Sequence, residues 1–209
     1  MTDAPTPIII VGLTGGSGAG KGHVCELLRE YGVPCLDTDR VAHDLYTPGH
    51  PCLDELHACF PPSVFLPDGT PDRARLGDAV FHDPAALARL NGITHRYIRA
   101  VCDRWLTQMH GEGHDMAVLD APVLFESGFA DMCRCTVGVL ADTETRVRRI
   151  VRRDGIPRER ALARIAAQHD DAFFTSHCTY VLRNPDGADL RGAVRELIAS
   201  IRRDCHETR

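Results

Sequence analysis

The chain has 209 residues, of which 44% are hydrophobic and 25% charged, and its formal net charge is -5 at pH 7. It is too apolar for a disordered protein, and its acidic balance disfavours a nucleic acid or an anionic membrane as partner. The first apolar run, at 8–13, is too short to cross a bilayer and lacks the flanks of a signal peptide, so we expect a cytoplasmic protein.

Residues Pro7–Leu13 form a short, β-branched apolar run that predicts a buried parallel strand. A glycine-rich turn follows, and then a segment from Gly22 to Gly32 with the apolar spacing of a helix. The turn, GGSGAGK at 15–21, matches the G-x-x-x-x-G-K pattern of a phosphate-binding loop. In such a loop, backbone N–H groups and the start of the helix bind phosphate, and the lysine reaches the outer phosphates.

Lys21 is the only lysine of the chain, and the other 23 basic residues are arginines. Because lysine carries a compact charge where arginine is a planar fork, this placement strengthens the assignment. The alternative is a structural turn that uses glycine only for its backbone freedom. We predict that the nucleotide-binding residues from this segment are Gly16, Ser17, Gly18, Ala19, Gly20, Lys21, Gly22 and His23.

Gly22 stands where Ser or Thr normally supplies a hydroxyl to Mg²⁺. Glycine has no side chain, and His23 is a softer ligand one position further round the helix. We therefore predict no metal ligand from Gly22, with Mg²⁺ held mainly by phosphates and water. The dispersed cysteines and histidines do not have the spacing of a zinc site.

Four further strands are predicted at 33–39, 116–125, 135–141 and 179–184, with helical patterns between them. This alternation predicts an α/β fold with a doubly wound, parallel, five-stranded sheet of P-loop kinase type. Two longer segments interrupt the sheet. Residues 48–113 predict a helical subdomain, with helices at 73–81 and 84–109. Residues 143–175 contain eight arginines on two helical arms that break at 154–157 and predict a lid.

The whole chain, 1–209, is thus expected to form a single domain, whose core comprises 1–47, 114–142 and 176–209. Asp37 and Asp39 follow the second strand, at the sheet edge where doubly wound folds bind ligands. For Asp37 we favour a cap of the next helix, and for Asp39 a base that accepts the proton of an attacking hydroxyl, with capping as its alternative. The lid arginines are either a solvated face or phosphate-binding groups, and we expect one or two to contact phosphate.

Four segments, in order and spacing, resemble the dephospho-CoA kinase family of P-loop proteins. They are GLTGGSGAGK at 12–21, LDTDRVAHDL at 36–45, DAPVLFESG at 120–128 and RRDGIPRERALARIAAQ at 152–168. The resemblance implies ATP as co-substrate, Mg²⁺ as cofactor, dephospho-CoA as small-molecule acceptor and the 48–113 insertion as its binding subdomain. It implies catalytic roles for Asp39 and Lys21, nucleotide contacts from Arg149 and Asn184, and acceptor contacts from Asp39, His43, His95, Pro122, Leu124, Phe125 and Glu126.

The chain departs from the family pattern at several positions. Gly22 and His23 replace Ser-Thr, Arg96 replaces Pro, Arg146 replaces Gln, Thr179 replaces Asp, and HDDAFF at 169–174 stands where a lid arginine is frequent. The leading hypothesis is an ATP-dependent kinase for the 3′-hydroxyl of dephospho-CoA, the last step of CoA synthesis. Its alternatives are a weakly catalytic or inactive nucleotide- or CoA-binding paralogue, and a kinase for another small nucleotide. We expect a monomer or weak homo-oligomer.

Overall fold

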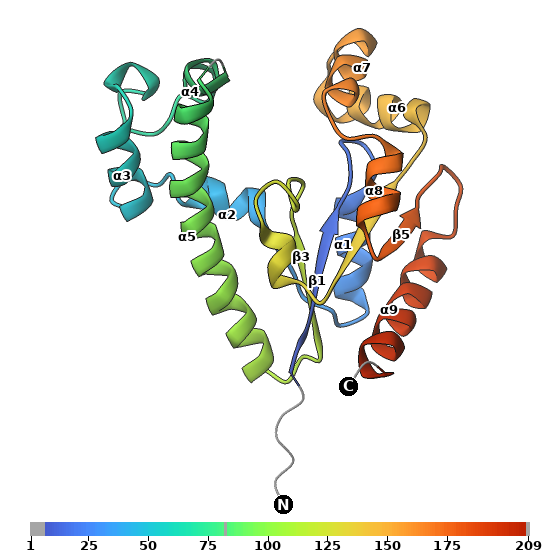
Figure 1. The fold of residues 1–209 in the computed structure, drawn as a ribbon. Helices are drawn as coiled ribbons and strands as arrows, with labels where there is room; N and C mark the ends of the chain where they lie inside the picture. The colour runs from blue at the N-terminus through green and yellow to red at the C-terminus, as the bar shows by residue number, and fades with distance from the viewer. Residues whose placement is uncertain (1–6, 82, 208–209) are drawn as a thin grey trace, which may run out of the picture. The chain divides into compact units, whose positions relative to one another are not determined.

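The structure is a computed structural model that describes residues 7–81 and 83–207. The chain divides into two compact units, one comprising Met1–Leu36 with Gln108–Arg209 and the other Asp37–Thr107. Figure 1 labels the α-helices of both units and the strands β1, β3 and β5. Each unit is described by itself below.

A five-stranded sheet forms the centre of the first unit, with the strand order β2-β3-β1-β4-β5. β1 pairs in parallel with β3 and β4, and β4 pairs in parallel with β5. The predicted fold class, a doubly wound parallel α/β sheet, is therefore confirmed. The strands are β1 Ile9–Thr14, β2 Cys35–Asp37, β3 Met116–Asp120, β4 Cys135–Leu140 and β5 Tyr180–Arg183.

Two helices, α1 Lys21–Glu30 and α9 Leu190–Glu207, share a hydrophobic core with the sheet. Val24 of α1 and Val194 of α9 are fully buried. Burying a side chain of this size contributes about 1.5–3 kcal/mol. This core fixes β1 and α1, and thus the two ends of the loop that joins them.

Two predicted strands end earlier than the sequence pattern indicated. The third was expected to reach residue 125, but β3 ends at Asp120. Pro122 has no N–H for a ladder, and the chain turns instead, with the N–H of Ser127 donating to Val123 O at 2.9 Å. The second was expected over 33–39, but β2 ends at Asp37 because that residue caps the next helix.

Three helices follow β4, where two helical arms were expected: α6 Thr143–Asp154, α7 Arg158–Ala166 and α8 Asp171–His177. The break between α6 and α7 lies at the expected place, because Gly155 adopts a left-handed conformation and Pro157 precedes the new helix. The unexpected α8 is capped by Asp170, whose carboxylate accepts a hydrogen bond from Phe173 N–H. A short 3-10 helix, η2 Phe129–Met132, follows β3.

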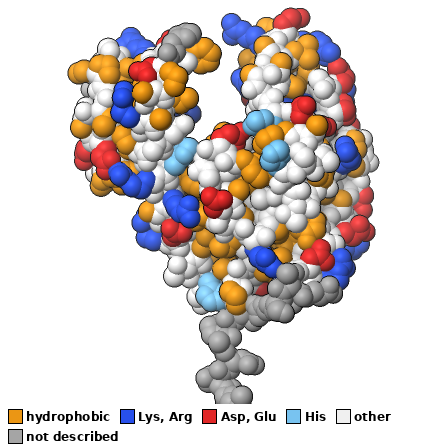
Figure 2. Space-filling model, viewed as in Figure 1, with side chains coloured by type: hydrophobic (Ala, Val, Ile, Leu, Met, Phe, Trp, Pro, Cys, Tyr) orange, Lys and Arg blue, Asp and Glu red, His pale blue; other side chains and the backbone are white. Residues whose placement is uncertain are grey.

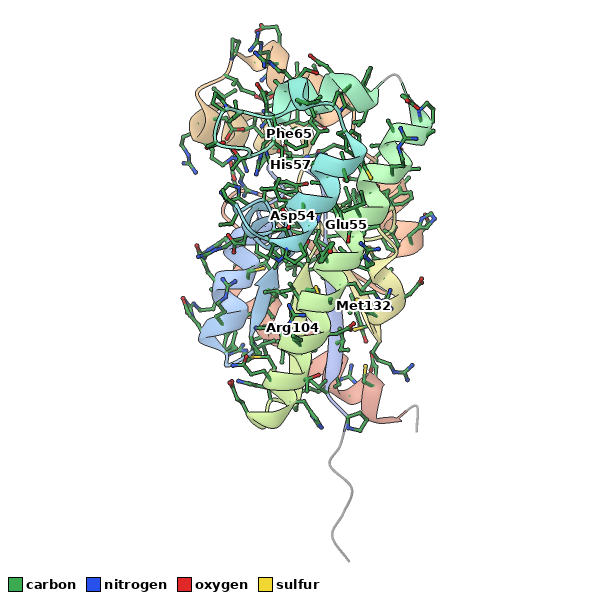
Figure 3. The ribbon with its side chains drawn as sticks, turned by 90° about the vertical axis from the view of Figure 1, so that its left-hand side faces the viewer. Asp54, Glu55, His57, Phe65, Arg104 and Met132 are labelled. Carbon is green, nitrogen blue, oxygen red and sulfur yellow. The ribbon has the colours of Figure 1, made fainter. Side chains whose placement is uncertain are left out.

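The second unit contains α2 Thr38–Asp44, α3 Pro51–Cys59, η1 Pro62–Val64 and α4 Arg73–Phe81, and most of α5 Pro84–Gly111. It begins before residue 48, since α2 follows β2 directly. Glu55 on α3, labelled in Figure 3, joins α3 to α5 by accepting hydrogen bonds from Tyr97 and Arg96. His57 on α3 contacts the ring of Phe65 edge-on at 4.3 Å and Gly69 O at 2.7 Å, which anchors the loop before α4 (Figure 3).

Candidate functional site

The loop between β1 and α1 turns through glycines with positive φ. Gly15, Gly18 and Gly20 have φ of 142°, 79° and 100°, values that L side chains rarely adopt. Lys21 begins α1, and its Nζ donates a hydrogen bond to Gly15 O at 3.1 Å, so the ammonium lies across the loop. This is the backbone geometry that presents N–H groups to phosphate.

Close packing is a second reason for glycine in this loop. A Cβ on Gly16 would lie 2.2 Å from the NH2 of Arg146, and one on Gly20 would lie 2.2 Å from the Nδ2 of Asn184. Both distances are far below van der Waals contact, so these glycines let α6 and the end of β5 approach the loop. Phosphate binding and backbone freedom were the reasons for glycine that the sequence indicated, and this close packing was not among them.

Arg146 and Gln168 from the lid hold the loop at Ser17. The Nε of Arg146 donates to Ser17 O at 2.9 Å, and its NH2 donates to Gln168 Oε1 at 3.1 Å. The same Gln168 oxygen accepts the backbone N–H of Ser17 at 2.8 Å. Arg146 is only 5% exposed, and burial lowers the pKa of its guanidinium, against a smaller raising effect of Asp171.

Arg149 and Asn184, both predicted nucleotide-binding residues, contact the other side of the loop. Arg149 NH1 donates to Ala19 O at 3.3 Å, and its NH2 donates to Asp186 Oδ1 at 2.9 Å. Asn184 Nδ2 donates to Ala19 O at 2.8 Å. In this structure their side chains therefore position the loop and its carbonyl groups.

The other lid arginines pair elsewhere. Arg158 binds Glu144 at 2.7 Å through two parallel hydrogen bonds, and Arg148 binds Asp186 at 2.6 Å. Asp154 accepts hydrogen bonds from Arg153 and Arg164, which lower its pKa to about 2. Over the face shown in Figure 2, basic and acidic side chains are interspersed. Within the described part of the chain, Arg146 and Arg149 are the lid arginines that reach the loop.

Gly22 and His23 both lie at the exposed start of α1. A Cβ on Gly22 would meet nothing within 4 Å, so a larger side chain has room there. The Nδ1 of His23 lies 3.1 Å from Glu26 Oε2, and the His23 side chain is 61% exposed. The imidazole is thus engaged along the helix surface.

Asp120, which the sequence analysis did not select, ends β3 beside the P-loop strand. It is the register partner of Leu13, and its Oδ2 accepts a hydrogen bond from Cys25 Sγ of α1 at 3.6 Å. The pKa of the Cys25 thiol is raised, first by its hydrogen bond with Cys35, then by burial and then by the Asp120 carboxylate. A carboxylate at a strand end beside the loop is the protein ligand that Mg²⁺ commonly keeps.

The residues present therefore fit Mg²⁺, with one carboxylate in place and an open position at Gly22. The described residues contain no cluster of three or more His, Cys, Asp or Glu side chains that could hold a metal ion by themselves. The sequence pattern placed Asp120 inside the strand predicted at 116–125, so its position at a strand end became clear only in the structure.

The segment after β3 contacts α8 and contains four residues predicted to contact the acceptor, Pro122, Leu124, Phe125 and Glu126. Pro122 O accepts a hydrogen bond from Thr14 Oγ1 at 3.2 Å. Leu124 is fully buried, and a Cβ on Gly12 would lie 2.7 Å from its Cδ2. Phe125 contacts the ring of Phe173 edge-on at 5.6 Å, and Glu126 Oε1 lies 2.8 Å from His169 Nε2.

In the second unit, Asp37 caps α2 as the sequence analysis favoured, accepting the N–H of Asp39 at 2.9 Å and of Arg40 at 3.1 Å. Asp39 lies exposed in the first turn of α2, two residues beyond β2. His95 lies on α5, and burial lowers its pKa.

A cavity of about 550 Å³ lies between the segment after α2 and the loop before α4. His43 and Arg73 are among its lining residues, and the NH2 of Arg73 lies 3.1 Å from His43 Nδ1. Tyr46, Leu66 and Pro71 add apolar surface to the lining. A cavity of this size with a few polar groups is typical of a small-molecule site.

Two of the departures from the family pattern have clear structural partners. Thr179 Oγ1 accepts Thr136 N–H at 3.2 Å, and Thr179 N–H donates to Thr136 Oγ1 at 3.0 Å, which ties β5 to β4. Arg96 pairs with Glu55 and stacks over the Tyr97 ring at 5.1 Å. Both residues therefore stabilise the fold.

A family model described as CoaE, dephospho-CoA kinase, matches residues 9–189 of this chain. A protein of Anaeromyxobacter dehalogenans named dephospho-CoA kinase is 36% identical over 194 residues, covering 92% of each chain. The chain belongs to the dephospho-CoA kinase family. The resemblance inferred from four sequence motifs is thereby confirmed.

Two solved structures share this fold over most of their length. TT1252 from Thermus thermophilus is 34% identical, with a TM-score of 0.79 over 94% of this chain and 97% of that one. The dephospho-CoA kinase from Campylobacter jejuni, at 23% identity and a TM-score of 0.64, covers 92% of this chain and 96% of its own and supports the fold alone. Among the described residues, no helix has both the length and the apolar character needed to span a membrane.

Proposed function

We propose that this chain transfers the γ-phosphoryl group of ATP to the 3′-hydroxyl of dephospho-CoA, giving CoA. The observation that carries the proposal is the loop at 15–21, with Lys21 across it, in a chain of the dephospho-CoA kinase family. Phosphoryl transfer needs positioned phosphates, compensation of their charge and an acceptor for the attacking hydroxyl's proton. Residues of this chain meet each of these requirements: the loop at 15–21 positions the phosphates, Lys21 compensates their charge, and Asp39 accepts the proton.

The first unit supplies the phosphate site. The N–H groups of the loop donate to phosphate oxygens, and the Nζ of Lys21 moves from Gly15 O to the outer phosphates. Arg149 and Asn184 keep the loop carbonyls turned away from the anion by holding Ala19 O. This arrangement is preorganised, so little reorganisation accompanies the reaction.

The second unit supplies the base and the acceptor cavity. Asp39 is exposed at the start of α2 and accepts the hydroxyl proton. The cavity beside His43 and Arg73 takes a non-reacting part of dephospho-CoA, since its lining offers both apolar surface and hydrogen-bonding groups. The other predicted acceptor contacts are His95, Pro122, Leu124, Phe125 and Glu126, and they stay predictions.

Mg²⁺, when bound, neutralises charge on the phosphates. Asp120 is the residue that would hold it, together with water and the phosphates, because Gly22 offers no oxygen. The lack of a hydroxyl at Gly22 favours one alternative, that the chain is a nucleotide- or CoA-binding paralogue with little catalysis. A cytoplasmic location and a monomeric or weakly oligomeric state remain predictions.

Product analysis distinguishes these functions. The purified chain is incubated with ATP, Mg²⁺ and dephospho-CoA, and the product is separated and tested for a new 3′-phosphate. Adenosine and AMP serve as rival acceptors. CoA formation with dephospho-CoA and little transfer to the rivals supports the proposal. Faster transfer to a rival supports a kinase for another nucleotide, and ATP binding without transfer to any acceptor supports the paralogue.

A further inference from the structure

The oxygen of Gln168 occupies an unusual place in the phosphate loop. It accepts the backbone N–H of Ser17 at 2.8 Å and an N–H of the Arg146 guanidinium at 3.1 Å. A loop N–H and a cationic guanidinium converging on one oxygen are the donors expected around a phosphate oxygen. Gln168 reaches this place from beyond the end of α7, with its own backbone N–H donating to Ile165 O.

The charge of Arg146 supplies an independent observation. Its guanidinium is 5% exposed, and its hydrogen bonds go to two neutral oxygens, those of Ser17 and Gln168. Within the described ranges, no carboxylate oxygen lies within the 4.0 Å that defines an ion pair with it. Asp171 acts on Arg146 only from beyond ion-pair distance, and its effect on the pKa is smaller than that of burial. A buried cation with so little compensation is costly, so the site gains from an anion that takes the place of the neutral amide.

We propose that Gln168 Oε1 marks a phosphate-oxygen position and is displaced when the nucleotide binds, so that Arg146 and Ser17 N–H then bind that phosphate. The inference rests on the proposed ATP-binding function of the loop and extends it to a named lid arginine. Arg146 exchanges a neutral acceptor for a charged one, which strengthens its hydrogen bond. Gln168 is a competitor of the nucleotide in the free protein.

Gly16 fits the same geometry. A Cβ there would overlap the NH2 of Arg146, so the guanidinium can lie against the loop only because residue 16 has no side chain. Of the eight lid arginines, Arg146 is the one whose charge is buried at the loop without an ion pair in the described chain; Arg149, in contrast, pairs with Asp186 at 2.9 Å.

The test is calorimetric binding of ATP, and separately of tripolyphosphate, to the natural chain and to two variants without any acceptor present. Gln168→Ala removes the competing oxygen, and we expect both ligands to bind about three- to tenfold more tightly. Gln168→Glu places a carboxylate on the same donors, and we expect at least about tenfold weaker binding of both ligands. The Glu variant should also melt at a higher temperature than the natural chain in the absence of ligand.

The other glutamine of the chain, Gln108, provides the matched control. It is exposed on α5, and its Nε2 donates to Glu112 Oε1 at 2.7 Å. Gln108→Ala and Gln108→Glu make the same chemical changes away from the loop and should leave both affinities unchanged. Tripolyphosphate lacks the adenine and ribose of ATP. An equal change in affinity for both ligands would therefore show that Gln168 competes with the phosphates.

Weaker binding in Gln168→Ala would overturn the inference, because it would make Gln168 a nucleotide ligand or a support of the lid. Equal affinities for all variants would overturn it as well, as would failure of the natural chain to bind either ligand. Gln168 is exposed, so neither variant is expected to unfold the chain. Failure of the dephospho-CoA assay alone would contradict the proposed acceptor and leave these binding results intact.

Discussion

Asn184 donates a hydrogen bond from its Nδ2 to the carbonyl oxygen of Ala19 over 2.8 Å. The side chain is 6% exposed, and it packs so closely on the loop that a Cβ on Gly20 would lie 2.2 Å from the same nitrogen. A buried amide of β5's carboxyl end thus determines which residue can precede Lys21. The glycine is required by its neighbours as well as by its φ of 100°.

A comparison of Gly20→Ala with Gly22→Ala tests this requirement. The left-handed backbone at Gly20 costs an L residue roughly 1–2 kcal/mol, and overlap with Asn184 adds to it. We expect urea unfolding to show a loss of about 2 kcal/mol or more for Gly20→Ala. Gly22→Ala, in open space within α1, should be neutral or stabilising by about 0.5–1 kcal/mol. Equal stabilities for the two variants would refute the packing argument.

Lys21→Ala should abolish measurable ATP binding in calorimetry. The substitution removes the only lysine of the chain from the loop and leaves the phosphate charge poorly compensated. Arg195→Ala removes a positive charge from an exposed position on α9 and is the control for net charge. Unchanged ATP affinity in Lys21→Ala would exclude the loop as the nucleotide site.

Asp39→Asn should lower kcat by about 10²-fold or more and leave ATP affinity nearly intact, because a base acts during transfer. The control is Asp103→Asn, which removes a carboxylate from an exposed position on α5. Steady-state kinetics with dephospho-CoA measure the effect. An Asp39→Asn variant that retains the turnover of the natural chain would show that another group takes the proton.

His95 makes folding stability depend on pH. Burial lowers its pKa below the ordinary value of 6.5, so the unfolded chain binds the proton more readily than the folded one. The free energy of unfolding should therefore fall as pH decreases below about 6.5, and fall less in His95→Gln. Denaturant titrations between pH 7 and 5, with the exposed His23→Gln as control, measure the two slopes. Identical slopes for the natural chain and His95→Gln would contradict the assignment.

The features of the fold that depend on residues close together in the chain could be predicted from the sequence. The strand, glycine loop and helix around Lys21 follow from apolar runs and glycine spacing, and α4 begins and ends at the predicted residues 73 and 81. β2 was predicted too long because its apolar pattern does not reveal that Asp37 turns its carboxylate onto the N–H groups of α2.

The contact of Arg146 and Gln168 with Ser17 was not predictable in the same way. Gln168 lies 151 positions from Ser17 along the chain, and no local pattern links the two. α8 was missed because its seven residues are too few to show a helical period. Asp120 was missed because the third strand was predicted to run to residue 125, which placed this acidic residue inside the strand and not at its end.

The central claim is that this chain transfers phosphate although Gly22 stands where a hydroxyl residue would bind Mg²⁺. A magnesium titration of CoA formation, at fixed ATP and dephospho-CoA, compares the natural chain with Gly22→Ser. A Cβ at this position meets nothing within 4 Å, so the serine fits without displacing a neighbour. We predict transfer by both proteins, with half-maximal rate at a lower Mg²⁺ concentration for Gly22→Ser, because its hydroxyl replaces a water as metal ligand. Transfer by Gly22→Ser alone, with none by the natural chain at any Mg²⁺ concentration, would contradict the account and identify a nucleotide-binding protein.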